Sequence, residues 1–324
     1  TTDPVGEMTV TVNGGNPGYT IISAPLKKSP QFQGVISVVD TSSVEFQNTE
    51  FSNGEFSGTD PNGDSEYFME ILSGQSAGMI LDVAGNDNDS LQILVGQSDL
   101  QSILSSGDEV SVTKYSTLSS LFGLNNEAGF QGGSASTADA LLIMTVTGSG
   151  EFDRRYFYQL DPFGVAGGEG WRQIGGDPSE DMGDVTVPPD TGILVIRKDP
   201  TDLSLKLAGQ VKTSPVSVPL ADGFSMVSSG FPLTTTLSES GLYQAGIATS
   251  LSGGSASSAD QVLVLGVGGI YTRYYYQLDP FGVAGGEGWR QVGGNPSVDV
   301  GSVEVGGVNG VVIFTRSGGK AWIQ

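Results

Sequence analysis

The segment GQSAG, from Gly74 to Gly78, matches the glycine-x-serine-x-glycine pattern found around the nucleophile of many serine hydrolases. That chemistry needs a histidine to accept the proton of Ser76, and the chain contains no histidine. The pattern also needs a helix after the serine, whereas a strand-like run follows here. We therefore interpret GQSAG as a glycine turn between two strands.

A second segment, TDPNGDSE, has the residue types of a calcium-binding loop. Asp60, Asn62, Asp64 and Glu66 place side-chain oxygens at alternate positions around a glycine. This spacing resembles the start of an EF-hand loop but lacks the distal glutamate that binds calcium with both oxygens. We predict these four residues as a candidate calcium site, with a plain polar turn as the alternative. No other cofactor is expected.

The absence of cysteine and histidine excludes several classes of enzyme. Without them the chain has no thiol or imidazole catalysis, no disulfide and no thiolate or imidazole zinc site. Asp161 and Glu169 could form an acid/base pair, but their spacing does not determine their separation. We expect a protein that is not an enzyme, and a carboxylate-based glycosidase is the enzymatic alternative.

The stretch YQLDPFGVAGGEGWRQ occurs twice without a change, starting at Tyr158 and at Tyr276. Loops usually tolerate variation, so identity of a whole loop suggests a working surface. Aromatic side chains beside arginine suit a protein interface or sugar stacking. The residues predicted for a lateral contact or a glycan contact are Phe163, Trp171, Arg172, Phe281, Trp289 and Arg290. The alternative is a hairpin whose loop folds back, with Trp171 covering the edge of the core.

These stretches belong to a tandem duplication of an all-β unit. GGSASTADALLIM at Gly132 is echoed at Gly253, and TGILVIRK at Thr191 is echoed by NGVVIFTR at Asn309. Short runs rich in Val, Ile, Thr and Tyr between glycine turns predict sandwich-like or barrel-like repeats. The first copy has a surplus with its own alternating strands. We predict a first repeat over residues 1–28 and 116–212, an inserted small β-barrel over 29–115, and a second repeat over 213–324.

Charge and hydropathy limit the partners. The formal net charge of −22 and the lack of a basic cluster argue against binding to nucleic acids. No apolar run approaches the roughly 20 residues of a transmembrane helix. Because the sequence opens on Thr1, we expect removal of an export signal and an extracellular or cell-surface location.

Several motifs together resemble a largely uncharacterised family of secreted β-rich proteins of verrucomicrobial bacteria. They are TTDPVG with TVTVNGG and YTIISAPL, then YFMEILSGQSAGMILDV and SLFG, and the repeated YYYQ, GWRQVGG and VIFTR. The resemblance covers nearly the whole chain and implies export rather than a particular chemistry.

The N-terminal segment predicts how copies assemble. Met8, Val10 and Val12 alternate with polar residues, as in a half-buried strand, and no segment precedes this strand as a partner. We therefore expect head-to-tail assembly of copies into filaments, in which this strand complements the C-terminal edge of the next copy; pairing within its own chain is the alternative. The predicted interface residues are Val5, Met8, Val10, Val12, Trp322 and Ile323. The alternative function is a secreted adhesin that binds surface polysaccharide through the repeated aromatic loops.

Overall fold

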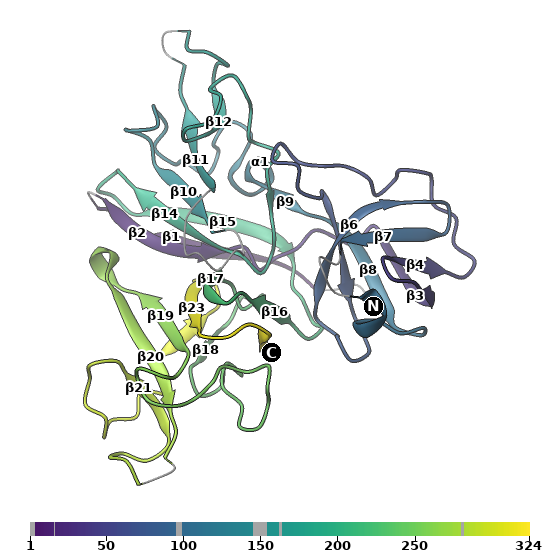
Figure 1. The fold of residues 1–324 in the computed structure, drawn as a ribbon. Helices are drawn as coiled ribbons and strands as arrows, with labels where there is room; N and C mark the ends of the chain where they lie inside the picture. The colour runs from purple at the N-terminus through teal and green to yellow at the C-terminus, as the bar shows by residue number, and fades with distance from the viewer. Residues whose placement is uncertain (1–3, 16, 95–98, 145–153, 162–163, 280–281) are drawn as a thin grey trace.

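A computed structural model describes residues 4–324 except for 16, 95–98, 145–153, 162–163 and 280–281. The chain is almost entirely β-structure, which confirms the predicted fold class. Figure 1 shows three bodies: the first repeat around β10–β12, the second repeat around β19–β21, and a barrel formed by strands of the inserted module.

The first repeat is a five-stranded antiparallel sheet covered on one face by a two-stranded ribbon. Across the sheet the strands are β12 (Gly170–Gln173), β11 (Arg154–Gln159), β10 (Ala140–Ile143), β14 (Gly192–Arg197) and β2 (Gly18–Ser23). The ribbon is formed by β1 (Val5–Val12) and β15 (Leu203–Gln210). The short pair β9 (Ser116–Thr117) and β13 (Thr186–Val187) and the helix α1 (Leu118–Phe122) complete the repeat.

The core of this repeat is formed by alternate residues of its strands. Tyr156 and Tyr158 lie in the core between sheet and ribbon, and Val10 and Val12 of β1 meet them from the other side. Phe157 is not part of that core cluster, as expected for the intervening residue of a strand.

The second repeat has the same arrangement. Its five-stranded sheet contains β17 (Gly223–Val227), β23 (Val311–Thr315), β19 (Gln261–Leu265), β20 (Tyr271–Gln277) and β21 (Gly288–Gln291). The 3-10 turn η2 (Val267–Gly269) joins β19 to β20. Two strand pairs complete it: β16 (Ser217–Leu220) with β24 (Lys320–Ile323), and β18 (Thr234–Thr236) with β22 (Glu304–Gly306).

These pairings correct the expectation of an unpaired N-terminal strand. β1 pairs along its whole length with β15 of its own chain, from Val5 opposite Gln210 to Val12 opposite Leu203. The segment SPVSVPL also has a partner, because β16 pairs with β24 in the C-terminal segment KAWIQ. The expectation was wrong because the last strand of each repeat returns to pair with its first strand.

The inserted module contains a closed six-stranded barrel that lies within the predicted residues 29–115. Around the barrel the strands are β3 (Phe32–Val39), β4 (Ser43–Phe46), β7 (Ser90–Leu94), β6 (Ile80–Asn86), β5 (Tyr67–Ile71) and β8 (Glu109–Lys114). The turn η1 (Leu100–Ser102) lies between β7 and β8. Alternate residues such as Val110 and Val112 fill the interior.

The two repeats pack through the outer faces of their five-stranded sheets. Ile21 and Leu194 of the first sheet share one hydrophobic cluster with Met226 and Val312 of the second. Two single β-bridges join the sheets: Ile22 pairs with Asn309, and Thr191 pairs with Val227. In the duplication Ile22 corresponds to Val227, and Thr191 corresponds to Asn309, so the two bridges are the same contact with the repeats exchanged. The repeats are therefore related by an approximate two-fold axis.

The barrel is joined to the repeats by a buried ion cluster. Glu70 of β5 accepts hydrogen bonds from Lys27 (2.7 Å) and from Ser214 (2.8 Å), and its other close partner is Lys212 (3.0 Å). Lys27 precedes the barrel in the chain, and Lys212 and Ser214 lie in the segment between the repeats. One buried carboxylate therefore links three parts of the fold.

Candidate functional site

The predicted calcium loop is a compact turn whose side chains already contact other groups. Asp60 is buried and accepts four hydrogen bonds: from the backbone N–H groups of Asn62 and Asp64, and from the N–H and hydroxyl groups of Thr186. Its carboxylate therefore fastens the barrel module to strand β13 of the first repeat.

The other three side chains of this loop point to three different partners. Asp64 pairs with Arg154, Asn62 donates to the Tyr156 hydroxyl at 2.9 Å, and Glu66 pairs with Lys114 at 2.8 Å. Among the described residues, no group of three or more Asp and Glu side chains is close enough to hold a metal ion. The contacts match the polar-turn alternative, and calcium binding stays a prediction that melting curves in calcium and in chelator would test.

Replacing Asp60 by Asn is expected to lower the free energy of unfolding by about 1–3 kcal/mol, because one oxygen that accepts from Thr186 or from the turn becomes a donor. The matched control is Asp177→Asn, an exposed turn position where the second repeat already has Asn295. Urea unfolding followed by circular dichroism measures the difference. Equal stability of the two variants would contradict the anchoring role of Asp60.

The segment GQSAG is a turn, as interpreted from the sequence. Gly74 has a φ of 84°, Ala77 donates to the Gly74 carbonyl at 3.4 Å, and the next element is strand β6. Gly78 has a φ of 92° and lies against Pro215 of the segment between the repeats.

The repeated loop is built around a buried arginine. Arg172 donates to the carbonyls of Pro178 (2.8 Å), Trp171 (2.7 Å) and Gly167 (2.6 Å). Arg290 makes the same three bonds in the second repeat, to the carbonyls of Pro296 (2.6 Å), Trp289 (2.8 Å) and Gly285 (2.6 Å). A planar guanidinium can satisfy several carbonyls at fixed angles, so the loop and its arginine constrain each other.

The tryptophans of this loop belong to the core. Trp171 packs edge-on against Tyr158 and donates its indole N–H to the Gly123 carbonyl at 3.0 Å. Trp289 packs in the same way against Tyr276.

The prediction of a lateral or glycan contact by Trp171, Arg172, Trp289 and Arg290 is therefore wrong, because all four side chains are buried. Phe163 and Phe281 lie outside the described residues. The loop alternative, with Trp171 covering the core, is what the structure shows.

The predicted interface residues divide into buried and exposed members. Val10, Val12 and Trp322 are buried in the cores of their own repeats, and Met8 is partly buried against the first core. The prediction that these residues make direct contacts between folded copies is therefore wrong, because their own chain covers them. Val5 and Ile323 are exposed.

Sequence reasoning missed a groove beside Ile323. It has a volume of about 710 Å³, and its apolar lining includes Phe231, Leu233 and Val211. The comparison of the two repeats contained a signal for it, because the second copy has the apolar segment GFPL where the first copy has SAPL. In the structure Leu233 of that segment is exposed.

Comparisons with known proteins leave the chain without a match: no family model, no curated protein and no solved structure is similar to it. The resemblance to secreted verrucomicrobial proteins stays a prediction. In the described part of the chain, no helix has both the length and the apolar character needed to cross a membrane.

Proposed function

We propose that this protein is an extracellular structural protein that assembles head to tail into filaments by passing strand β1 from each copy to the next. The observation that carries the proposal is the attachment of β1. It is the first strand of the described chain, and its ladder hydrogen bonds go to β15 alone, outside the five-stranded sheet.

Exchange of this strand would conserve the contacts that it makes now. Val10 and Val12 of an incoming copy would fill the positions that the chain's own residues occupy, and the eight-residue ladder to β15 would be the same. Such swaps are a low-cost route to assembly because the free energy of the strand contacts hardly changes. A swap that passes from copy to copy without closing generates an open filament.

The connection after β1 contains two glycines that can serve as a hinge. Gly14 donates to the Asp202 carboxylate at 2.7 Å, and Gly15 donates to the Asp199 carbonyl at 3.1 Å. Glycine accepts the change of φ and ψ that an opened hinge needs. A glycan-binding function has no comparable support, because the tryptophan and arginine side chains expected to bind sugars are buried.

A disulfide that locks β1 to its own β15 tests the proposal. The chain has no cysteine, so Thr9→Cys with Lys206→Cys, at directly opposed and exposed positions, forms the only pair. Directly opposed Cβ atoms lie about 4.5–5.5 Å apart, a distance that a disulfide bridge tolerates. We expect the variant that is oxidised as a monomer to form no filaments in negative-stain microscopy and the reduced variant to form them.

The control places the same lock in the second repeat. Pro219→Cys with Ala321→Cys joins β16 to β24 and leaves β1 free to exchange. This variant should form filaments whether oxidised or reduced. If the β1 lock also leaves filaments intact after oxidation, strand exchange is not the connection between copies.

A further inference from the structure

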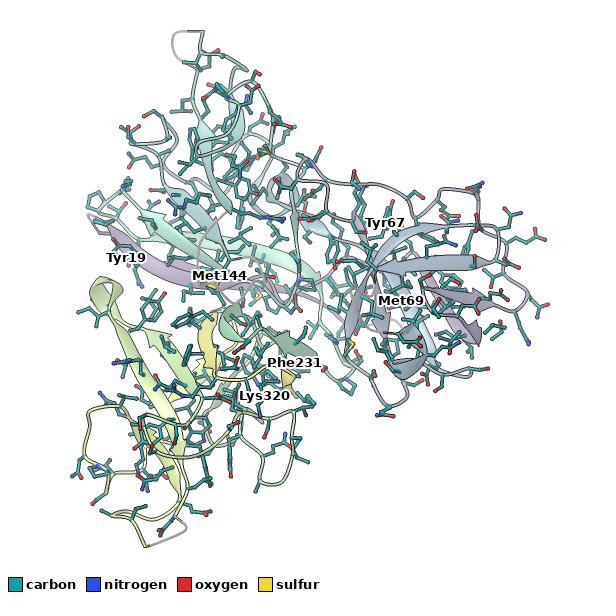
Figure 2. All side chains as sticks on the ribbon, viewed as in Figure 1. Tyr19, Tyr67, Met69, Met144, Phe231 and Lys320 are labelled. Atoms are coloured by element: carbon teal, nitrogen blue, oxygen red, sulfur yellow. The ribbon has the colours of Figure 1, made fainter. Side chains whose placement is uncertain are left out.

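A polar pocket with a volume of about 260 Å³ lies between the two repeats. Asn13 and Tyr19 line it from the first repeat, and Thr234, Glu304 and Asn309 line it from the second. Tyr19 belongs to β2, Thr234 to β18 and Glu304 to β22, so strands from distant parts of the chain position these side chains. Figure 2 labels Tyr19, near the place where the first repeat meets the second.

Backbone hydrogen bonds between the repeats fix the walls of this pocket. Gly310 donates to the Ile21 carbonyl at 3.1 Å, and Ser23 donates to the Val308 carbonyl at 3.0 Å. Both Ile21 and Gly310 line the pocket. The pocket is therefore formed before a ligand arrives, as is usual for small-molecule sites.

The position related to this pocket by the approximate two-fold axis is covered in the first repeat. The strand pairs β9–β13 and β18–β22 match Tyr115 with Thr234 and Thr186 with Glu304. Tyr115 and Thr186 are buried, and Thr186 donates to Asp60 of the inserted barrel. The second repeat carries no such insertion, and there Thr234 and Glu304 are exposed.

The polar side chains of the lining have no partner within the described part of the chain. Asn13, Tyr19, Thr234, Glu304 and Asn309 make no side-chain hydrogen bond or ion pair with another described residue. Two amides, two hydroxyl groups and one carboxylate are therefore free to bind a ligand. Together they offer donors as well as acceptors.

The size and charge of the pocket favour a small, uncharged ligand. A volume of about 260 Å³ lies just below the usual range of about 300–1,000 Å³ for drug-sized ligands, so it suits a molecule of the size of one sugar ring. Glu304 is the one charged residue of the described lining, and the whole chain has a net charge of −22. Phosphorylated and acidic ligands are therefore repelled.

We propose that this pocket binds one unit of a neutral sugar. Sugar hydroxyl groups donate and accept hydrogen bonds, which matches the mixed donors and acceptors of the lining. The Tyr19 ring offers a flat apolar surface for the C–H groups of a sugar, and it is held in place by Gly269, where an added Cβ would lie 2.8 Å from the ring. The site is separate from the repeated loops, whose tryptophans are buried, and it goes beyond the proposed role in filaments.

Ligand-observed saturation-transfer NMR with the full chain tests the site. The protein carries the β1 lock, oxidised as a monomer, which blocks strand exchange, and the probes are glucose, galactose, mannose and N-acetylglucosamine. At least one of these sugars should bind with a Kd of about 1 mM. Asn309→Ala and Glu304→Ala, both at exposed positions, should each raise that Kd at least about ten-fold.

The matched control is Asn295→Ala, which removes an exposed amide of the second repeat outside the pocket and should bind like the parent. Melting curves followed by circular dichroism should show that all three variants are folded. Absence of saturable binding of all four sugars, or an unchanged Kd in either pocket variant, would overturn the site.

Glucosamine separates recognition of hydroxyl groups from attraction of a cation to Glu304. Binding of glucosamine without binding of any neutral sugar would assign the pocket to a cationic ligand and refute the proposal. Sugar binding by the locked chain needs no filament, so its success or failure does not bear on strand exchange.

Discussion

Replacing Trp171 by Ala is expected to lower the free energy of unfolding by about 3–5 kcal/mol, the usual cost of truncating a large buried aromatic side chain. Trp171 fills the space between Phe122, Phe130 and Tyr158, and its indole N–H has a carbonyl partner. Both the packing and the hydrogen bond are lost in the variant. Urea unfolding followed by circular dichroism measures the effect.

Two further variants sharpen this prediction. Trp289→Ala should destabilise the second repeat in the same way, because Trp289 lies in the equivalent core. Val165→Ala changes an exposed residue of the same loop and should alter stability by no more than about 0.5 kcal/mol. A Trp171→Ala protein of normal stability that assembles poorly would instead show that the tryptophan acts at a surface.

Replacing Glu70 by Gln is expected to cost about 3–5 kcal/mol, because the variant leaves the Lys27 and Lys212 ammonium groups buried without their shared carboxylate. All three side chains are more than nine-tenths buried, so water cannot solvate the two ammonium groups once the carboxylate charge is removed. The matched control is Glu66→Gln, which breaks the partly exposed pair with Lys114 and should cost about 0–1 kcal/mol. Equal effects of the two variants would contradict a stabilising ion cluster at the junction.

The pH dependence of stability gives this cluster a second test. Burial alone would raise the pKa of Glu70, but Lys212, Lys27 and the hydrogen bonds from Lys27 and Ser214 outweigh it, and the pKa is lowered from its ordinary value of 4.5. A carboxyl group with a lowered pKa stabilises the fold above its unfolded pKa and loses that effect as the pH falls through its folded pKa. The stability difference between the parent and Glu70→Gln should therefore be full at neutral pH and shrink below about pH 4.5.

Burial shifts the pKa of Lys212 in the opposite direction to that of Glu70. Desolvation lowers the pKa of the Lys212 ammonium group, and the nearby Glu70 carboxylate partly restores it. Removal of the carboxylate should lower this pKa further. The part of the Glu70→Gln destabilisation that comes from a buried, charged Lys212 should therefore be full at neutral pH and be relieved as the pH rises through the lowered pKa, where Lys212 loses its charge in the folded state.

The local sequence was sufficient to predict the strands and to exclude much chemistry. Alternation of Val110 and Val112 with Ser111 and Thr113 predicts a strand, and β8 is one. Its valines lie in the barrel core, and Ser111 and Thr113 are buried as well. The duplicated segments predict two similar domains, and the two five-stranded sheets share one strand arrangement. The lack of histidine and cysteine excludes imidazole and thiol catalysis whatever the fold. These properties depend on residue type and short-range periodicity, which the chain carries in every conformation.

Partners and burial depended on the tertiary structure. Strand β1 pairs with β15, nearly two hundred positions later in the sequence, and backbone hydrogen bonds look the same at every strand edge, so the alternation of Met8, Val10 and Val12 could not identify that partner. The identical loops looked like surfaces because their glycines and aromatic residues occur in both; only the folded loop shows that Arg172 and Trp171 point inward.

Leu26 and Leu233 show the same limit most clearly. Both follow a proline at the same point of the duplicated unit, and their local sequences predict similar environments. One is buried and the other is exposed: β15 runs past Leu26 to Gln210, whereas no segment of the described chain covers Leu233 in this way. Residue type determines how strongly a side chain favours burial, but a distant segment of the chain must arrive to cover it, and that is decided only by the tertiary structure.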